Sequence, residues 1–503
     1  MAAGRLTRTV GIVACGRAAH TIGVLAVWGI LARPWTQIEL GIFLALWTAT
    51  SSLVPLFLLG LPTALLYFHP RTGLRGQRLL IAQVGGLLLV AGAILFAGMV
   101  SFGPALLQRW RPEDLGEVAE IRRYLLAFAP YLFALVAGGS VEATLVAAGR
   151  PAHQAALAVA GAAGLVAVAA TVAACNASVV QALYGFSAVG VTRLLTGLML
   201  VARCLPGTQD SSNGVRSLGE LLRYAMPIWL ADGVGSLSRY VDRLVVLGFF
   251  TAATFPLYQF GAIEVPIGLL LSAVVTVLVP EVSRLYANRQ LAAIGSLWRQ
   301  AVGRLALIVL PLWAYLFFFA GPLITLYATA RYGPAVWVFR VFLLALPLRC
   351  AVYNPLLVGM GKARWAFWGS VGDLVVNAGL SVLLVQMLLT RGSEWAYLGA
   401  AVATVTATYL QVGFLVGAVA FHLRWRLQDL LPWWRLLRVG GWATGAAGLA
   451  WWLTRSLSTP ALVLGWGTAA FTALICLGLL LDPPDRQELR YVLHSLGRHR
   501  HGA

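Results

Sequence analysis

The residues of this chain that could do chemistry are ionisable side chains placed inside long apolar runs. An ionisable residue in the middle of a membrane costs at least about 2.5–3.5 kcal/mol, so it should face protein or water and marks a functional site by default. Guanidinium groups stay charged and can bind phosphate in a bidentate way, so an excess of them favours an anionic ligand. The basic residues of this set are Arg17, Arg193, Arg239, Arg243, Arg340 and Arg349. The acidic residues are Glu142, Asp232, Asp242, Glu264 and Asp373.

Arg17 and Arg349 are the strongest candidates for cations that line a substrate cavity. Each has long apolar stretches on both sides and no acidic neighbour one helical turn away, so it has no ion-pair partner on its own helix. Pairing with a carboxylate on another helix is the alternative. Arg239, Arg340 and Arg193 complete the predicted substrate-binding set, and for these three the two interpretations are closely balanced.

The segment 222–249 has the densest charges. Asp232, Arg239 and Arg243 are spaced by seven and four residues, which places them along one stripe of a helix. Arg239 and Asp242 are also neighbours at a spacing of three. One face of this helix must therefore contact water or be paired. A structural ladder of ion pairs along the stripe is the alternative to a binding site, and Arg243 could instead reach the headgroups.

The elements that position these residues are membrane-spanning helices. Of the 503 residues, 60% are hydrophobic and only 11% are charged, whereas a soluble protein carries roughly 25% charged residues. A helix that crosses a membrane needs about 20 mostly apolar residues, and about 14 runs meet this length. They are 10–32, 38–66, 79–102, 122–148, 152–174, 179–202, 222–249, 254–279, 302–328, 335–360, 364–388, 396–421, 437–454 and 460–481. The sequence predicts an all-α, polytopic membrane protein.

The basic residues also predict the topology. If the N-terminus is cytoplasmic, the inner segments hold most of the arginines and the outer segments hold few, as the positive-inside rule requires. Both termini are therefore expected in the cytoplasm. The net charge of +19 is spread over these short segments rather than gathered in a basic domain, so we expect no nucleic-acid partner.

The chain contains an internal duplication. Gly149-Arg150 and Gly361-Lys362 each separate two predicted spans, and Tyr184-Gly185 and Tyr397-Leu398-Gly399 each enter a later span. Because six predicted spans separate the copies, both halves have the same orientation and form parallel repeats. Chance similarity among apolar segments is the alternative interpretation.

The duplication predicts the domain organisation. Two parallel six-helix lobes cover 1–205 and 222–424, joined by a cytoplasmic linker at 206–221, with an appended helix pair at 425–481 and a basic cytoplasmic tail at 482–503. Two such lobes can enclose a cavity that opens alternately to either side of the membrane. This architecture suits a transporter and gives an enzyme no obvious benefit.

The acidic residues inside the spans could couple transport to H⁺ or Na⁺, or could form ion pairs. Glu142 is expected to pack between the lobes or to pair with an arginine, with proton coupling as the alternative, and the same options hold for Glu264 and Asp373. The sequence has no nucleotide or nucleophile motif, and its five cysteines lack C-x-x-C spacing. We therefore predict no catalytic residue, no metal site and no cofactor.

Short motifs in a fixed order accompany this architecture: Ala225-Met226-Pro227, Asp242-Arg243, Pro256-Leu257-Tyr258, Val279-Pro280-Glu281-Val282-Ser283-Arg284 and Gly361-Lys362-Ala363. With them, the chain resembles the multidrug/oligosaccharidyl-lipid/polysaccharide exporter superfamily over nearly its whole length. Within that superfamily it is similar to the bacterial polysaccharide-biosynthesis (O-antigen type) flippases.

The resemblance implies a flippase in the bacterial cytoplasmic (inner) membrane. Basic residues of its central cavity would hold the diphosphate of an undecaprenyl-linked saccharide while the lipid tail stays in the bilayer. Other membrane proteins of polysaccharide assembly are implied as further partners.

Two other branches of the superfamily remain as alternatives. Flippases of lipid II resemble the chain in span number but usually carry an arginine pair in span one, where this chain has only Arg17. They also have an arginine in span eight, where this chain has Glu264. Cation-coupled drug antiporters use an acidic residue in the first or seventh span, which the position of Asp232 matches.

Overall fold

The computed structural model describes residues 2–105, 118–204, 217–265 and 267–481. These residues form helices joined by turns and short loops, and none of them lies in a β-strand. Eleven helical segments of the described chain are long and apolar enough to cross a membrane. The all-α, polytopic membrane fold is therefore confirmed. The predicted tail at 482–503 and most of the predicted linker at 206–221 lie outside the described residues.

The chain divides into two compact units. Unit 1 comprises Met1–Gln259 and Ser370–Ala403, and unit 2 comprises Phe260–Gly369 and Thr404–Ala503. The division into lobes at 1–205 and 222–424 stays a prediction.

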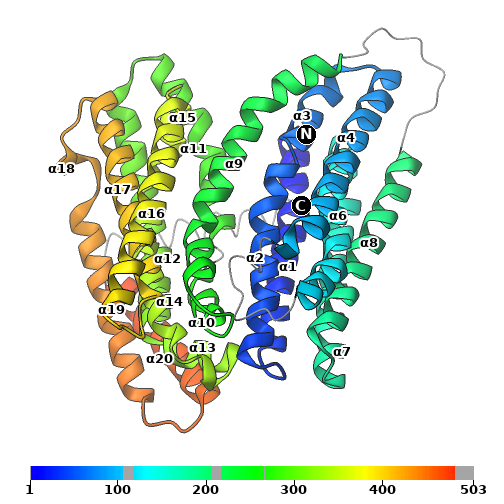
Figure 1. The fold of residues 1–503 in the computed structure, drawn as a ribbon. Coiled ribbons are helices and arrows are strands. Elements are labelled where there is room, and N and C mark those ends of the chain that lie inside the picture. Colours follow the sequence, from blue (N-terminus) through cyan, green and yellow to red (C-terminus); the bar gives the residue numbers. More distant parts are fainter. Residues whose placement is uncertain (1, 106–117, 205–216, 266, 482–503) are drawn as a thin grey trace. The chain divides into compact units, whose positions relative to one another are not determined.

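Unit 1 is a bundle of long helices (Figure 1). Helix α6 packs against both α4 and α8, and α1 packs along α7. The core near α2 is aromatic, because Trp47 contacts the rings of Phe43, Phe128, Tyr131 and Phe186. The helices that begin in the first segment of unit 1 are α1 (Ala2–Leu31), α2 (Gln37–Phe57), α3 (Leu61–Phe68), the 3₁₀ turn η1 (His69–Arg71), α4 (Leu74–Ser101), α6 (Val118–Ala147), α7 (Pro151–Cys175), α8 (Val179–Cys204), α9 (Leu218–Phe249) and α10 (Phe255–Gly261).

Unit 2 packs α12 along α19, and α19 against α20. Phe319 at the end of α12 is fully buried with Ala450, Val463 and Leu464, so the appended helix pair shares a core with α12. The elements are α11 (Gly268–Ala287), α12 (Leu291–Phe318), α13 (Ala320–Ala328), η2 (Ala330–Tyr332), α14 (Ala335–Leu343), η3 (Leu346–Cys350), α15 (Tyr353–Gly359), α18 (Leu427–Leu430), α19 (Trp433–Thr454) and α20 (Pro460–Leu481). Helices α16 (Ala363–Thr390) and α17 (Leu398–Leu423) contribute to both units.

Several predicted spans are interrupted helices. The run 38–66 breaks between α2 and α3, where Leu59 and Gly60 have φ of 53° and 66°, and Pro55 lies just before. The indole Nε1 of Trp229 donates a hydrogen bond of 2.7 Å to the Leu56 carbonyl, which the break leaves outside regular helix bonding. The run 335–360 is likewise divided into α14, η3 and α15.

Three of the predicted runs do not appear among the eleven apolar segments. The run 222–249 lies within α9, which carries several charges, and 254–279 is divided into α10 and α11, so its description as one helix is wrong. The run 437–454 lies within α19, which has a tryptophan pair near each end, Trp433–Trp434 and Trp451–Trp452. About 18 residues of helix rise roughly 27 Å, close to the hydrocarbon thickness, and tryptophans favour both interfaces. The length of α19 and the positions of its tryptophans are therefore those expected of a membrane-spanning helix.

Candidate functional site

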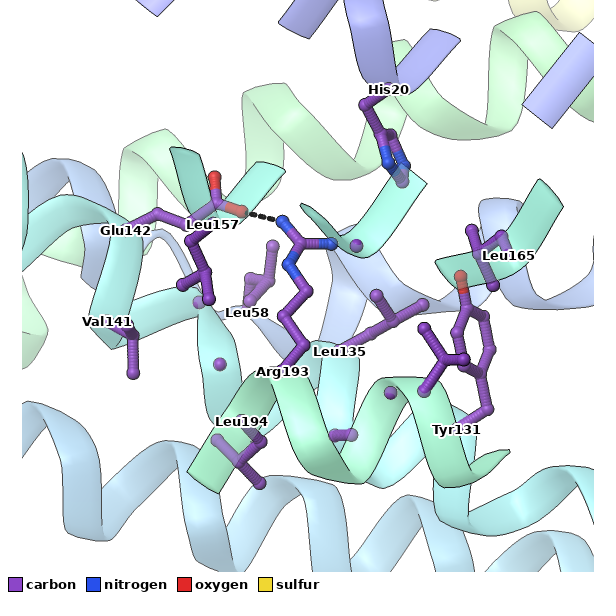
Figure 2. Close-up of a pocket in the computed structure, with 16 residues that line it drawn as sticks. His20, Leu58, Tyr131, Leu135, Val141, Glu142, Leu157, Leu165, Arg193 and Leu194 are labelled. Carbon is purple, nitrogen blue, oxygen red and sulfur yellow. Dashed lines mark hydrogen bonds and ion pairs between the residues drawn. The ribbon is translucent and has the colours of Figure 1, made fainter. Parts of the chain in front are cut away.

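A polar pocket lies inside the helix bundle of unit 1 (Figure 2). Its volume is about 230 Å³, and its lining comes from α1, α6, α7, α8 and the turn after α2. Most of the lining is leucine, valine, alanine and glycine, so the few polar side chains stand out: His20, Tyr131, Glu142 and Arg193. The pocket therefore joins a charged centre to an apolar wall.

The charged centre is an ion pair between α6 and α8. Arg193 Nη2 donates to Glu142 Oε1, and the two side chains are 19% and 39% exposed. Gly161 on α7 leaves room for the arginine, because a Cβ there would lie 3.0 Å from Arg193 Cδ. Arg193 and Glu142 were predicted as a substrate-binding cation and an ion-coupling or ion-pairing acid, and here each is the partner of the other.

His20 faces this ion pair from α1 (Figure 2). Its Nδ1 is buried and has no hydrogen-bond partner among the described residues. His20 is not among the predicted site residues, although it lies one helical turn after Arg17 and so on the same helix face.

Arg17 and Arg349 are not locked by carboxylates. Both side chains are exposed, and no ion pair joins either one to a described residue. Arg17 lies in the apolar segment Gly11–Leu31, and Arg349 lies in η3 within the apolar segment Ala335–Gly359. The structure thus keeps two cations inside candidate membrane spans without local neutralisation in the part of the chain it describes.

Arg340 is held by aromatic rings and a carbonyl. Its Nε donates a hydrogen bond of 3.2 Å to Phe317 O, and its guanidinium lies 5.5 Å from the Phe317 ring centroid and 5.2 Å from that of Trp337. Its charge is therefore stabilised within unit 2 by cation–π contacts.

The charged residues of α9 lie in two places and do not form the ladder of ion pairs that was the alternative to a binding site. Asp232 and Arg239 are exposed and line a second pocket, of about 260 Å³, beside the break between α2 and α3. Asp242 is buried and pairs with the adjacent Arg243, at 3.3 Å, instead of with Arg239. Arg243 is itself buried, so the suggestion that it reaches the headgroups is wrong.

A buried polar network surrounds Asp242. The hydroxyl of Tyr258 donates a hydrogen bond of 2.7 Å to Asp242 Oδ2, and Arg243 Nη1 donates one of 2.7 Å to Arg239 O. Nearby on α9, Ser238 Oγ donates to Asp373 Oδ2 of α16. Two of the predicted acids, Asp242 and Asp373, thus become members of one α9–α16 cluster.

Tyr258 and Ser238 were missed as site residues. Ser238 is four residues before Asp242, a spacing that could have indicated it, whereas no local pattern connects it to Asp373.

Glu264 does not lie within a continuous helix. It is exposed in the non-helical stretch between α10 and α11. Among the described residues, no group of three or more His, Cys, Asp or Glu side chains is arranged to hold a metal ion.

The comparison with known proteins gives one family match and several structural matches. Residues 120–337 match the family described as "Polysaccharide biosynthesis protein". No curated protein matches the chain.

Several solved structures of membrane transporters resemble the chain. The lipid II flippase MurJ, in an inward closed conformation, is 12% identical with a TM-score of 0.70, and the match covers 93% of this chain and 99% of MurJ. An inward-facing multidrug resistance MATE family transporter is 14% identical with a TM-score of 0.65, covering 80% and 94%. A MOP superfamily transporter from Pyrococcus furiosus is 16% identical with a TM-score of 0.57, covering 84% and 96%.

These matches confirm the resemblance predicted from the short motifs and the helix pattern. The chain has the fold of the MOP superfamily of membrane transporters, and its residues 120–337 carry the sequence pattern of the polysaccharide biosynthesis family.

Proposed function

We propose that this protein is a flippase that moves a lipid-diphosphate-linked oligosaccharide from the inner to the outer leaflet of the bacterial cytoplasmic membrane. The observation that carries the proposal is the pair of exposed cations, Arg17 and Arg349, inside candidate membrane spans. The transporter fold and the polysaccharide family match at residues 120–337 support the substrate class.

The physical argument starts from the cost of burying a charge. An arginine that faces lipid tails costs several kcal/mol, so an exposed and unpaired guanidinium in a span should face water or a ligand. A diphosphate needs compensating positive charge in such an environment, and the planar guanidinium binds it through two parallel hydrogen bonds. In this proposal each of Arg17 and Arg349 binds phosphate oxygens of the substrate during transport, and the lobes predicted at 1–205 and 222–424 provide alternating access.

The test is a pair of alanine variants in a bacterium that depends on this protein for its surface polysaccharide. Arg17→Ala and Arg349→Ala should abolish the polysaccharide at unchanged protein level, and the Arg→Lys variants should retain part of it because they keep the charge. Arg150→Ala, at an exposed turn between α6 and α7, is the matched control and should have no effect. Normal polysaccharide in both Arg17→Ala and Arg349→Ala would remove the assignment.

The network around Asp242 supports coupling of the transporter to H⁺ or Na⁺. The buried Asp242 accepts a hydroxyl hydrogen bond from Tyr258 and the half-buried Asp373 accepts one from Ser238, so each carboxylate can change its protonation or exchange its hydroxyl donor for a cation. Asp242→Asn and Asp373→Asn should each reduce transport driven by an ion gradient, whereas Glu264→Gln, outside the network, should not. An unchanged gradient dependence in both Asn variants would contradict this coupling site.

A lipid II flippase is the second candidate, because the MurJ match extends over 93% of this chain. Complementation separates the two functions. A strain depleted of its lipid II flippase should not be rescued if the substrate is a larger lipid-linked oligosaccharide, and rescue would favour lipid II. A cation-coupled drug antiporter would instead show drug efflux that fails with Asp232→Asn and survives loss of the two arginines.

A further inference from the structure

Arginines and tryptophans of unit 2 lie on α12, on the segment that leads from α17 to α19, and at the start of α19 (helices labelled in Figure 1). Helix α12 packs along α19, and the chain between α17 and α19 is itself basic. Asp429 is the only acidic residue in the segments 291–304 and 424–438. We call the following residues the basic aromatic patch: Arg299, Trp425, Trp433, Trp434 and Arg435.

Two glycines of α12 build the patch. Trp425 packs against Gly295 so closely that a Cβ there would overlap the indole ring. About two turns further along α12, a Cβ at Gly303 would lie 3.0 Å from Nη1 of Arg435. Gly295, Arg299 and Gly303 are spaced by four residues and so share one face of α12. The Trp425 ring and the two arginines therefore gather on that face.

Arg299 is oriented by the tryptophan. Its guanidinium carbon lies 5.1 Å from the Trp425 ring centroid, within the range of a cation–π contact. A cation–π contact leaves the N–H donors of the guanidinium able to bind a bidentate acceptor. By contrast, Arg284 at the end of α11 is neutralised by Glu281. No ion pair of this kind joins Arg299 to a described residue.

The tryptophans of α19 indicate the depth of the patch. Trp433 and Trp434 are 50% and 78% exposed at the start of α19, and the second tryptophan pair lies near its end. Tryptophan prefers the headgroup region, so Arg435 and Arg299 lie at the level of lipid phosphates. Leu437, 67% exposed, adds apolar surface beside them. A lipid, which brings both a phosphate and an acyl chain, fits this combination better than a free phosphate ion.

We propose that the basic aromatic patch binds the phosphate of an anionic phospholipid, with Arg299 and Arg435 as the phosphate ligands and the exposed tryptophans against the glycerol and acyl region. The predicted topology places the patch on the cytoplasmic side, where basic residues attract anionic headgroups. In this proposal the lipid stays bound to the protein and is not the substrate that the protein transports.

The experiment uses the purified full-length protein in nanodiscs of phosphatidylcholine that contain increasing fractions of phosphatidylglycerol, with bound lipid measured by native mass spectrometry. Arg299→Gln combined with Arg435→Gln should weaken phosphatidylglycerol binding about tenfold or more, as expected for the loss of charge-assisted hydrogen bonds. Arg299→Lys should have an intermediate effect, because it keeps the charge and loses the planar fork. Inorganic phosphate should not compete with the lipid.

The control is Arg284→Gln, which removes one exposed basic charge outside the patch and should leave binding unchanged. Gly295→Val should weaken binding without any change of charge, since it displaces Trp425; a melting temperature near the wild-type value shows that this variant is folded. Wild-type affinity in the double arginine variant, or an equal loss in Arg284→Gln, would overturn the proposal. Full competition by inorganic phosphate would also overturn it, because the site would then be an ion site.

Discussion

Charged side chains in the membrane-spanning helices differ in what compensates their charge. Arg193 is compensated by Glu142, Arg243 by Asp242 and Arg340 by aromatic rings. Arg17 and Arg349 have no such ion-pair partner in the described chain. This difference separates groups that hold the fold together from groups that are available to a ligand. Among the arginines, it makes Arg193 a candidate for stability experiments and Arg17 and Arg349 candidates for transport experiments.

The Glu142–Arg193 pair gives a stability prediction. Glu142→Leu leaves a half-buried guanidinium without its partner and should lower the free energy of unfolding by about 1–3 kcal/mol. Adding Arg193→Met removes the unpaired charge. The double variant should therefore lose less free energy of unfolding than the two single variants lose together. Denaturant unfolding in detergent micelles measures the free energy of unfolding of the two single variants and of the double variant. Additive losses would show that the two side chains do not interact energetically.

The interruption between α2 and α3 lies against a neighbouring helix, α9. The break between α2 and α3 places Gly60 against α9 and opens the pocket lined by Asp232 and Arg239. Helix breaks at such sites are tolerated in membranes only where the freed backbone groups find protein or water partners. The Trp229 indole supplies one such partner, at the Leu56 carbonyl.

Gly60 tests the importance of that break. Gly60 has φ of 66°, and an added Cβ would lie 2.6 Å from the Ala225 carbonyl oxygen. Gly60→Ala should therefore destabilise the protein by at least about 1–2 kcal/mol, the cost of the left-handed backbone alone. The matched control is Gly98→Ala on α4, where an added Cβ meets nothing within 4 Å. Equal melting temperatures for the two variants would contradict this account.

The turn between α3 and α4 gives a pH prediction. His69 is 8% exposed, and burial lowers its pKa below the ordinary value of 6.5. The folded state therefore favours the neutral imidazole, so stability is highest above pH 6.5 and decreases as the pH falls from 6.5 toward the lowered pKa. The melting temperature should fall between pH 7.5 and pH 5.5, and His69→Gln should reduce that fall. A pH dependence identical in the variant would assign the effect to other groups.

The whole chain combines two compact units whose helices carry aromatic residues and arginines at their ends. The uneven distribution of arginines predicts how the complete molecule lies in the membrane, with both termini inside. In a cysteine-free background, a thiol reagent that cannot cross the membrane should label Arg391→Cys and should not label Arg150→Cys in intact cells. Both side chains are exposed, so burial does not affect the comparison. The reverse pattern would invert the topology and the direction of transport.

The sequence by itself determined the membrane class, the all-α fold, most of the span positions and most of the ionisable residues inside the spans. These properties depend on composition and on short-range periodicity, which a single chain displays directly. The resemblance to the MOP superfamily could also be recognised from the sequence, because short motifs keep their order along the chain. The tryptophan pairs of α19 were visible too, although its glycines and tryptophans keep it out of the apolar set.

Only the tertiary structure decided which charge meets which partner. Glu142 and Arg193 lie on helices α6 and α8, and Ser238 and Asp373 lie on α9 and α16, so no local spacing could connect them. The break at Leu59 and Gly60 also depends on the tertiary structure. Helix α9 supplies the contacts that compensate for the interrupted helix there. Pairing and helix interruption depend on distances across the fold, and those are set by packing between segments far apart in the chain.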